Sequence, residues 1–226
     1  MDFLSGSTLL VDKPLGWTSF DVVSKLRWNL KNKLGIKKIK VGHAGTLDPL
    51  ASGLLVICTG KHTKKITEFI NDKKTYTGTF LLGKTTPSYD LETTFNETFP
   101  INHIDAQLIE STSKKFIGII QQTPPIFSAK QIEGKRAYDL ARAGKEVTLN
   151  PVTIEIQSLT LNLDNFPEID FCITCSKGTY IRSFAHDFGK ALKSGATLIN
   201  LRRTQSGKHS IEDAKSVDEW IQIIHS

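Results

Sequence analysis

Apolar residues recur along the chain at two spacings, and each spacing predicts one kind of element. Near the N-terminus, four of them follow one another at helical spacing: Phe20, Val23, Leu26 and Leu30. Such a stripe is typical of a helix that turns one face toward a core. Thr18 and Asp21 stand ahead of it at the spacing of a capping box, and Gly35 predicts its end.

The same reasoning predicts the other elements. Helices are expected at residues 62–70, 104–116, 136–143, 181–192 and 217–224. Strands rich in apolar and β-branched residues are expected at 8–11, 54–59, 75–82, 147–161, 168–176 and 197–203. Residues 41–52 and 122–135, which contain Gly and Pro, are expected to be irregular. Because regular helices do not separate the long strands, we expect an α+β fold with a mixed, largely antiparallel sheet.

The balance of charged residues adds a candidate partner. The 226 residues include 29 Lys and Arg against 23 Asp and Glu, which gives a net charge of +6 and an isoelectric point of about 9.1. Cationic side chains release counterions from phosphates, so a basic chain suits a nucleic acid. From charge alone, a soluble protein that is basic without such a partner is an equal alternative.

The cysteines and the apolar runs indicate a cellular compartment. Cys58, Cys172 and Cys175 are too few for a disulfide framework in a chain of this length. The N-terminal residues lack the basic and long apolar stretches of a signal peptide. The longest apolar runs, such as residues 54–58, are far too short to cross a bilayer. We therefore expect a cytoplasmic protein without a membrane segment.

Candidate chemistry is densest at residues 42–53, where three glycines surround one imidazole and one carboxylate. The glycines let the backbone turn sharply and approach a ligand closely. Asp48, which precedes Pro49, has a structural interpretation as the N-cap of a helix. His43 has one as a buried structural histidine. Against the capping interpretation, the residues after Pro49 soon become an apolar strand, which leaves little helix to cap.

Five segments together resemble one protein family. Residues 42–55 read Gly-His-Ala-Gly-Thr-Leu-Asp-Pro-Leu-Ala-Ser-Gly-Leu-Leu, which resembles the signature of the TruB family of tRNA pseudouridine-55 synthases. Segments 11–14, 124–129, 177–182 and 201–203 match further family motifs. The resemblance extends from about residue 7 to about residue 215. It implies a single pseudouridine synthase catalytic domain over residues 1–226, with a central sheet, flanking helices and an RNA-gripping insertion at about 122–147.

The resemblance implies that Asp48 is the catalytic nucleophile. Pseudouridine forms when the bond between N1 and C1′ breaks, the uracil turns, and C5 joins C1′. No electrons or groups are exchanged, so neither cofactor nor metal is expected. The reaction needs an ionised nucleophile in a site that excludes water. Attack on the base and attack on the sugar both fit the sequence.

Arg182 is a charged residue for which a partner of opposite charge is expected. In the family, the matching arginine is the candidate partner that keeps the buried carboxylate charged. Its place in the first turn of a predicted helix opposes the macrodipole, which by itself calls for an anionic partner. Without the resemblance, a solvated surface arginine would be the better interpretation.

Four more residues match positions that contact the target uridine in the family. Tyr76 is expected to stack on the base with its hydroxyl near the proton lost from C5, and Tyr180 and Leu201 to line the uridine pocket. His43 is expected to enter the space that the flipped base leaves, since a planar ring stacks on neighbouring bases. From pattern alone, Tyr76 and Leu201 are core residues of strands.

The insertion resembles a mobile segment that grips RNA in the family. Its basic residues are expected to contact phosphates: Lys130, Lys135, Arg136, Arg142 and Lys145. The alternative is a solvated basic face. The expected substrate is uridine-55 in the T arm of tRNA, and the expected protein is a monomer. The alternative function is an RNA-binding or tRNA-folding protein whose catalysis is dispensable.

Two motifs suggest other chemistry. Residues 78–85 match the phosphate-loop pattern of nucleotidases, but they look like a strand, and Pro87 follows where a helix is needed. Cys172 and Cys175 have metal-like spacing without a second pair, and residues three apart on a strand point to opposite faces. We therefore expect neither a nucleotide site nor a zinc site.

The chain departs from the family pattern at a few places. Phe127 stands where the family usually has Tyr, Lys130 is displaced by one position, and Thr93 stands where Gly is common. These changes put RNA contacts in doubt rather than the chemistry. About a dozen residues follow Ala214, so we expect no C-terminal RNA-binding PUA-type domain, which many family members carry.

Overall fold

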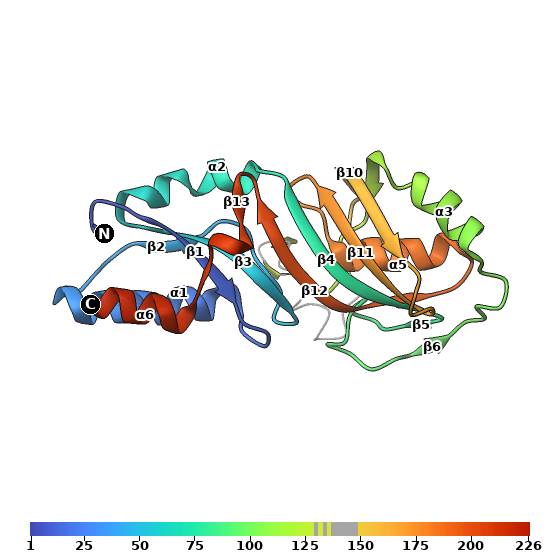
Figure 1. The fold of residues 1–226 in the computed structure, drawn as a ribbon, viewed down its shortest axis with the longest axis horizontal. Helices are drawn as coiled ribbons and strands as arrows, with labels where there is room; N and C mark the ends of the chain where they lie inside the picture. The colour runs from blue at the N-terminus through green and yellow to red at the C-terminus, as the bar shows by residue number, and fades with distance from the viewer. Residues whose placement is uncertain (129–130, 133–134, 137–148) are drawn as a thin grey trace. The chain divides into compact units, whose positions relative to one another are not determined.

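The chain folds into two compact units. The computed structural model describes residues 1–128, 131–132, 135–136 and 149–226. The first unit comprises Met1–Thr77 and Leu201–Ser226, and the second comprises Gly78–Asn200. Strands β4 (Lys74–Leu82) and β12 (Ala196–Ser206) have residues in both units. Each unit has its own helices (Figure 1), and buried apolar residues form a hydrophobic core in each.

The sheet of the first unit is centred on strand β3 (Ala51–Thr59). Strand β1 (Thr8–Lys13) runs antiparallel along one edge of β3. The other edge is shared by β12, which is parallel, and β2 (Val41–His43), which is antiparallel. The remaining elements of this unit are α1 (Ser19–Leu34), η1 (Gly60–Lys65), α2 (Ile66–Asn71), β13 (His209–Ser210), η2 (Ile211–Asp213), β14 (Lys215–Ser216) and α6 (Val217–His225).

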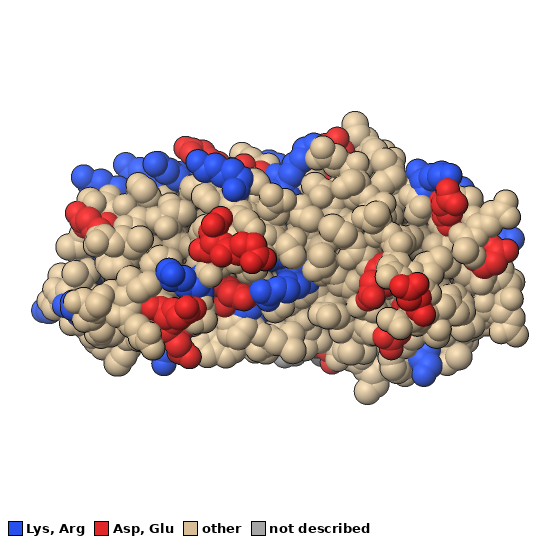
Figure 2. Space-filling view, in the orientation of Figure 1, with Lys and Arg blue, Asp and Glu red and all other residues tan. Residues whose placement is uncertain are grey.

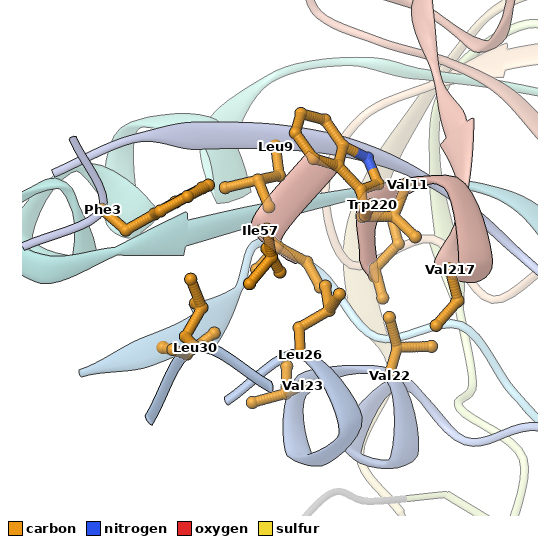
Figure 3. Packing of buried hydrophobic residues seen from close by; sticks show 13 residues of the cluster. Phe3, Leu9, Val11, Val22, Val23, Leu26, Leu30, Ile57, Val217 and Trp220 are labelled. Atoms are coloured by element: carbon orange, nitrogen blue, oxygen red, sulfur yellow. The ribbon is translucent and has the colours of Figure 1, made fainter. Parts of the chain in front are cut away.

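Helices α1 and α6 lie side by side and cover this sheet (Figure 1). Their apolar side chains meet those of β1 and β3, as Leu26, Ile57 and Trp220 do in Figure 3. The indole Nε1 of Trp220 donates to the carbonyl oxygen of Leu10 at 2.8 Å, so the buried ring keeps its polar group satisfied. This core fixes the strands from which the loop of Asp48 projects.

The expected helix near the N-terminus is confirmed as α1, with both of its end signals. Thr18 and Asp21 form the capping box, and Gly35 ends the helix with a φ of 63°. The assignment of Phe20 to its apolar stripe was wrong, because the Phe20 side chain is 63% exposed. Val22 is buried in its place. Phe20 lies about half a turn from Val22, and the core takes the face of Val22.

The second unit has a sheet in the order β4-β11-β10-β7, with β10 antiparallel to both of its neighbours. Its elements are β5 (Lys84–Thr85), β6 (Glu97–Thr98), α3 (Ala106–Lys114), β7 (Gly118–Gln122), β8 (Gln131–Ile132), β9 (Lys135–Arg136), β10 (Val152–Asn162), β11 (Glu168–Cys175) and α5 (Ile181–Ala191). Its core is a group of rings with centroids 5.4 to 6.2 Å apart: Phe80, Phe116, Phe171, Phe184 and Phe188. The helix predicted at 181–192 is confirmed as α5, and the apolar residues that recur at helical spacing there are all buried: Ile181, Phe184, Ala185, Phe188 and Leu192.

The expected α+β fold with a mixed, largely antiparallel sheet is confirmed, but four local predictions were wrong. Residues 41–52 were expected to be irregular, but β2 and the start of β3 lie there, because both pair within the sheet. Strand β7 was not predicted, because it is an edge strand whose Ile119 is 77% exposed. Residues 131–132 and 135–136 pair as strands β8 and β9, where a loop and a helix start were expected. Strand β10 starts after Pro151, not at 147, because proline has no N–H for the ladder. The rest of the expected helix, residues 137–143, lies outside the described residues.

Candidate active site

Asp48 begins a tight turn that leads directly into strand β3. The amide of Ala51 donates to the carbonyl oxygen of Asp48 at 3.0 Å, and Pro49 takes the second place of the turn. Proline suits this place because its ring sets the backbone angle that the turn requires. Since β3 starts at Ala51, Asp48 caps no helix. The capping interpretation of Asp48 was therefore wrong.

The backbone on both sides of Asp48 is held by residues of the first unit. The Ser19 hydroxyl accepts from the amide of Leu47 at 2.8 Å and donates to the carbonyl oxygen of Leu47 at 3.1 Å. Both residues are buried. On the other side, the amide of Gly16 donates to the carbonyl oxygen of Pro49 at 2.8 Å. These bonds fix the position from which the half-buried Asp48 side chain projects.

Hydrogen bonds from the Arg203 side chain connect the same loop to strand β3. This side chain is buried, and its Nε and Nη2 donate to the carbonyl oxygens of Leu54 at 2.7 Å and Gly45 at 3.1 Å. Gly53 has a φ of +102°, and a Cβ there would collide with the backbone of Arg203. Glycine is thus required where β3 and β12 approach each other.

Lys13, at the end of β1, places a buried amino group near the loop. Its Nζ donates to the carbonyl oxygens of Pro14, at 2.9 Å, and Trp17. Burial lowers the pKa of Lys13 to about 8, and the negative charges of Asp48 and Asp21 oppose this shift. At neutral pH, Lys13 therefore supplies a positive charge that attracts the Asp48 carboxylate.

His43 stands at the end of β2, with Ile57 of β3 as its register partner. Burial lowers the pKa of His43, and the charge of Arg203 lowers it further. The ring is therefore neutral at pH 7. A neutral planar ring suits stacking on bases better than it suits pairing with a phosphate.

Tyr76 and Leu201 lie in the first unit with Asp48. Leu201 is the register partner of Ala51, so β12 brings it beside the end of the Asp48 turn. Tyr76 is 9% exposed on β4, and Phe80 and Leu82, which share its face of the strand, are buried too. Both positions agree with the simple interpretation as core residues of strands. Their roles toward a uridine stay predictions.

The second unit holds Arg182 in the first turn of α5. The Arg182 side chain is 5% exposed, so its interpretation as a solvated arginine was wrong. Its Nε lies 3.5 Å from Oδ2 of Asp90, and its Nη1 donates to the carbonyl oxygen of Ser88 at 3.3 Å. Asp90 is therefore an anionic partner of Arg182 within the second unit, as the helix position called for. The pairing of Arg182 with the Asp48 carboxylate stays a prediction.

The start of α5 is anchored by one side chain of β7. The side-chain Oε1 of Gln122 accepts a hydrogen bond from the backbone amide of Tyr180 at 2.8 Å. Its Nε2 donates to the backbone carbonyl oxygen of Tyr180 at 3.0 Å. Next to it, the Ser183 hydroxyl donates to the carbonyl oxygen of Thr123 at 2.7 Å. Tyr180 is the N-cap residue of α5 and is half-buried.

Sequence reasoning missed three residues that position this chemistry. Ser19 lies between the predicted capping residues Thr18 and Asp21 and was given no role, and Lys13 entered only as part of the matched segment 11–14. Asp90 carried no motif role, although its position after Tyr89 is unusual, since Tyr89 has a φ of +65°. A backbone angle of this kind is not visible in sequence. No sequence signal identified Asp90 as a partner of Arg182.

The basic residues of the insertion fall mostly outside the described part of the chain. Lys130, Arg142 and Lys145 lie there, so the structure does not test their roles. Lys135 and Arg136 form strand β9, whose backbone alone is described. Their contacts with phosphates stay predictions.

The two motifs that suggested other chemistry are parts of strands. Residues 78–85 lie in β4 and β5, and the next helix of the described chain is α3. On β11, Cys175 is buried and Cys172 is half-buried. Among the described residues, no three His, Cys, Asp or Glu side chains gather as metal ligands do. The helices of this described part are all too short or too polar to span a bilayer.

Known proteins share this sequence over nearly its whole length. The model of the TruB family pseudouridylate synthase (N terminal domain) matches residues 31–181. The chain is 53% identical over 224 residues to tRNA pseudouridine synthase B of Phocaeicola vulgatus, which covers 98% of this chain and 95% of that protein. It is 54% identical over 214 residues to tRNA pseudouridine synthase B of Flavobacterium johnsoniae, with 94% and 93% covered.

A solved structure shares the fold. A chain in the "Crystal Structure of a Cbf5-Nop10-Gar1 Complex" aligns with a TM-score of 0.72 and 27% identity, over 97% of this chain and 54% of that one. The present chain thus spans about half the length of that protein. A chain in the "Crystal structure of the archaeal box H/ACA sRNP Nop10-Cbf5 complex" shows the same fold, with a TM-score of 0.68 and 24% identity.

Proposed function

The chain belongs to the TruB family of pseudouridylate synthases, and we propose that it isomerises uridine-55 in the T arm of tRNA to pseudouridine, with Asp48 as the nucleophile. Its fold is the expected pseudouridine synthase fold. The relatives that carry tRNA pseudouridine synthase in their names match nearly the whole chain, which supports tRNA as the substrate. The anchored turn of Asp48 is the observation that carries the choice of nucleophile.

The reaction needs an ionised nucleophile held in place. The bond between N1 and C1′ breaks, the uracil turns, and C5 bonds to C1′, while C5 loses a proton and N1 gains one. A carboxylate attacks either C1′ or the uracil ring, leaves again, and is regenerated. Both points of attack need the same thing of the protein, which is a fixed carboxylate in a site that excludes water.

The structure of the first unit supports this role for Asp48. The hydrogen bonds to Leu47 and Pro49 hold the backbone on either side of it. The half-buried carboxylate is attracted by the cation of Lys13, which is itself held by two carbonyl oxygens. A fixed nucleophile near a fixed charge requires little reorganisation when the reaction begins.

The target base must leave the RNA stack before it can reach a partly buried carboxylate. We assign His43 to the space that the base leaves, because its low pKa keeps the ring neutral and suited to stacking. We assign contacts with the target uridine to Tyr76, Tyr180 and Leu201. Arg182 supports turnover rather than affinity, and the basic residues of the insertion contact phosphates.

Release of tritium from tRNA labelled at C5 of uridine tests the nucleophile. We expect wild type to release tritium from an unmodified tRNA transcript. We expect Asp48→Asn to lose about 10⁴-fold in turnover, as enzymes do without their nucleophile or its base, and to bind tRNA as wild type does. Asp218→Asn is the matched control, because it removes an exposed carboxylate in the first turn of α6 and should keep full turnover.

Two results would contradict the proposal in different ways. Full turnover by Asp48→Asn would refute the role of Asp48 as nucleophile. Tritium release from a transcript with cytidine at position 55 would refute the choice of uridine. A wild-type protein that binds tRNA without releasing tritium would favour the alternative function, in which the protein binds or folds tRNA and catalysis is dispensable.

A further inference from the structure

A groove of about 810 Å³ opens on the first unit, and its described lining includes none of the residues assigned to the reaction. Five cationic side chains line it: Arg27, Lys31, Lys37, Lys38 and Lys40. Its described lining includes no acidic residue. Helix α1, the connection from α1 to β2, and η1 with α2 form its walls, and Gly42 of β2 belongs to its lining. We call this feature the lysine groove.

The lysine groove lies in the segment that holds the excess positive charge of the chain. Residues 22–67 include ten of the 29 Lys and Arg residues but only one of the 23 Asp and Glu residues, which is Asp48. This segment therefore carries a net charge of +9, and the remainder of the chain carries −3. The net charge of +6 is thus a local property of one segment rather than an even coating of the surface.

The cations of the groove are positioned in two ways. Nη2 of Arg27 donates to the carbonyl oxygen of Val41 at 2.9 Å, which fixes its guanidinium at the β2 wall. The planar guanidinium has further N–H donors to offer an anion. Lys37, Lys38 and Lys40 are exposed and follow the end of α1 at Gly35. Their long side chains can follow an anionic chain instead of converging on one point.

More positive charge stands beside the groove. Thr63 of η1 is part of the groove lining, and the exposed lysines of η1 flank it: Lys61, Lys64 and Lys65. Figure 2 shows Lys and Arg side chains gathered along the edge that carries η1 and α2. Like charges at this density repel one another and destabilise a compact unit unless an anion neutralises them.

Strand β2 connects the groove to the candidate active site. Val41 and Gly42 line the groove, and His43 is the next residue of the same strand. An RNA whose flipped nucleotide leaves a space for His43 must therefore pass close to the groove opening. This step rests on the proposed function of His43.

We propose that the lysine groove binds the ribose-phosphate backbone of the substrate RNA next to the nucleotide that reacts. Phosphate groups along a strand are opposite in charge to a row of lysines, whose flexible side chains can adjust to the phosphate spacing. Binding releases the counterions of the phosphates. Contacts of this kind position an RNA and carry no sequence information. The groove thus adds affinity for tRNA, while selection of the uridine stays with the active site.

The test removes three charges from the groove and, in a matched control, three from elsewhere on the same unit. The groove variant is Lys37→Gln, Lys38→Gln and Lys40→Gln. The control is Lys25→Gln, Lys208→Gln and Lys215→Gln, three exposed lysines outside the groove lining. Binding of unmodified tRNA transcript is measured in the Asp48→Asn background, so that no product forms, at several KCl concentrations between about 50 and 200 mM. Tritium release is measured with Asp48 intact, and thermal unfolding checks that both variants fold.

We expect the groove variant to bind tRNA about tenfold more weakly at low salt. We also expect the slope of log K against log salt to fall by about two, since each lost phosphate contact accounts for about 0.7 to 0.9 of that slope. In the turnover assay, the loss appears as a raised KM, with kcat changed by less than about twofold. The control should keep the wild-type slope and stay within about twofold of wild-type affinity.

The outcomes separate this proposal from the proposed function. Equal losses in the two variants would overturn the groove, because net charge alone would then explain them. A groove variant with wild-type affinity and slope would overturn it as well, and the reaction would be unaffected. If wild type releases no tritium but the groove variant still loses affinity and slope, the proposed reaction fails and the RNA-binding groove stands.

Discussion

The Asp48 turn and the start of helix α5 show two ways of holding a charged side chain. In the first unit, the backbone of an irregular loop is fixed, since Ser19 bonds both backbone groups of Leu47. In the second unit, Gln122 bonds both backbone groups of Tyr180 in the same manner, and two residues further on the Arg182 side chain pairs with Asp90 and donates to Ser88.

The difference follows from what each charge has to do. A nucleophile must be able to form and break a bond, so its position is best set by its backbone and its surroundings. A buried arginine has no such requirement, and leaving it unpaired would be costly. We therefore expect turnover to depend more on the backbone anchor at Asp48, and stability to depend more on the ion pair at Arg182.

The largest effect is expected from the ion pair of the second unit. Arg182→Met leaves Asp90 buried without this cation, which should lower the free energy of unfolding by about 3 to 5 kcal/mol. Urea unfolding measures this loss. In the tritium assay, turnover should fall far more than tRNA affinity.

A double variant separates stability from catalysis at this pair. Arg182→Met with Asp90→Asn removes both charges and should regain most of the lost stability but not the turnover. Recovery of turnover in the double variant would show that Arg182 acts only on stability. A loss confined to tRNA affinity would instead make Arg182 a phosphate contact.

A smaller effect is expected from the anchor of the Asp48 turn. Ser19→Ala leaves the buried amide and carbonyl of Leu47 without this hydroxyl, which should cost about 1 to 3 kcal/mol. A shifted Asp48 should lower kcat by about tenfold to a hundredfold. Thr18→Ala is the matched control, since it removes only the cap of the same helix, should cost about 1 kcal/mol and should keep kcat.

Gln122 is the residue of the second unit that corresponds to Ser19 in the first. Gln122→Leu removes the anchor of Tyr180 and should cost a similar amount of stability, but kcat should change less, because Asp90 and Ser88 still hold Arg182. Gln121→Leu, at the exposed neighbouring position, should stay within about 0.5 kcal/mol of wild type. Equal losses of kcat in Ser19→Ala and Gln122→Leu would remove the distinction between the two units.

The smallest effects concern one histidine in each unit. Burial lowers the pKa values of His43 and His186, aided by Arg203 and Lys190 respectively. In the unfolded chain, the histidines have a pKa of about 6.5 and bind protons below that pH. The folded histidines, with lower pKa values, bind fewer, so the free energy of unfolding falls as the pH falls. His43→Gln and His186→Gln should each flatten this fall between about pH 7 and 5, by about 1 kcal/mol or less.

Turnover distinguishes the two histidines. His43→Gln should also raise KM or lower kcat at pH 7, because the ring is assigned to the space of the flipped base. His186 stacks on Tyr89 at 3.9 Å and has no assigned role in the reaction, so His186→Gln should affect stability alone. Unfolding curves at several pH values, with tritium release at pH 7, measure both effects. Unchanged kinetics of His43→Gln would remove its assigned role.

Local sequence signals predicted much of the fold. The capping box of Thr18 and Asp21, the end of α1 at Gly35, and the apolar stripe of α5 depend on residues a few positions apart, so their spacing is visible in the chain. The missed strand β7 and the exposed Phe20 had no such signal. Whether an apolar residue is covered depends on which element packs against it, and spacing does not contain that information.

The place of the candidate chemistry could be predicted from the chain alone, since residues 42–55 resemble the family signature around Asp48. How the Asp48 turn is held could not be predicted in this way, because Ser19 lies 28 residues from the backbone that it bonds. The pairing of Arg182 with Asp90 and the walls of the lysine groove likewise join residues that are distant in the chain. Local spacing specifies helices, strands and turns, whereas contacts across long separations form only when those elements pack.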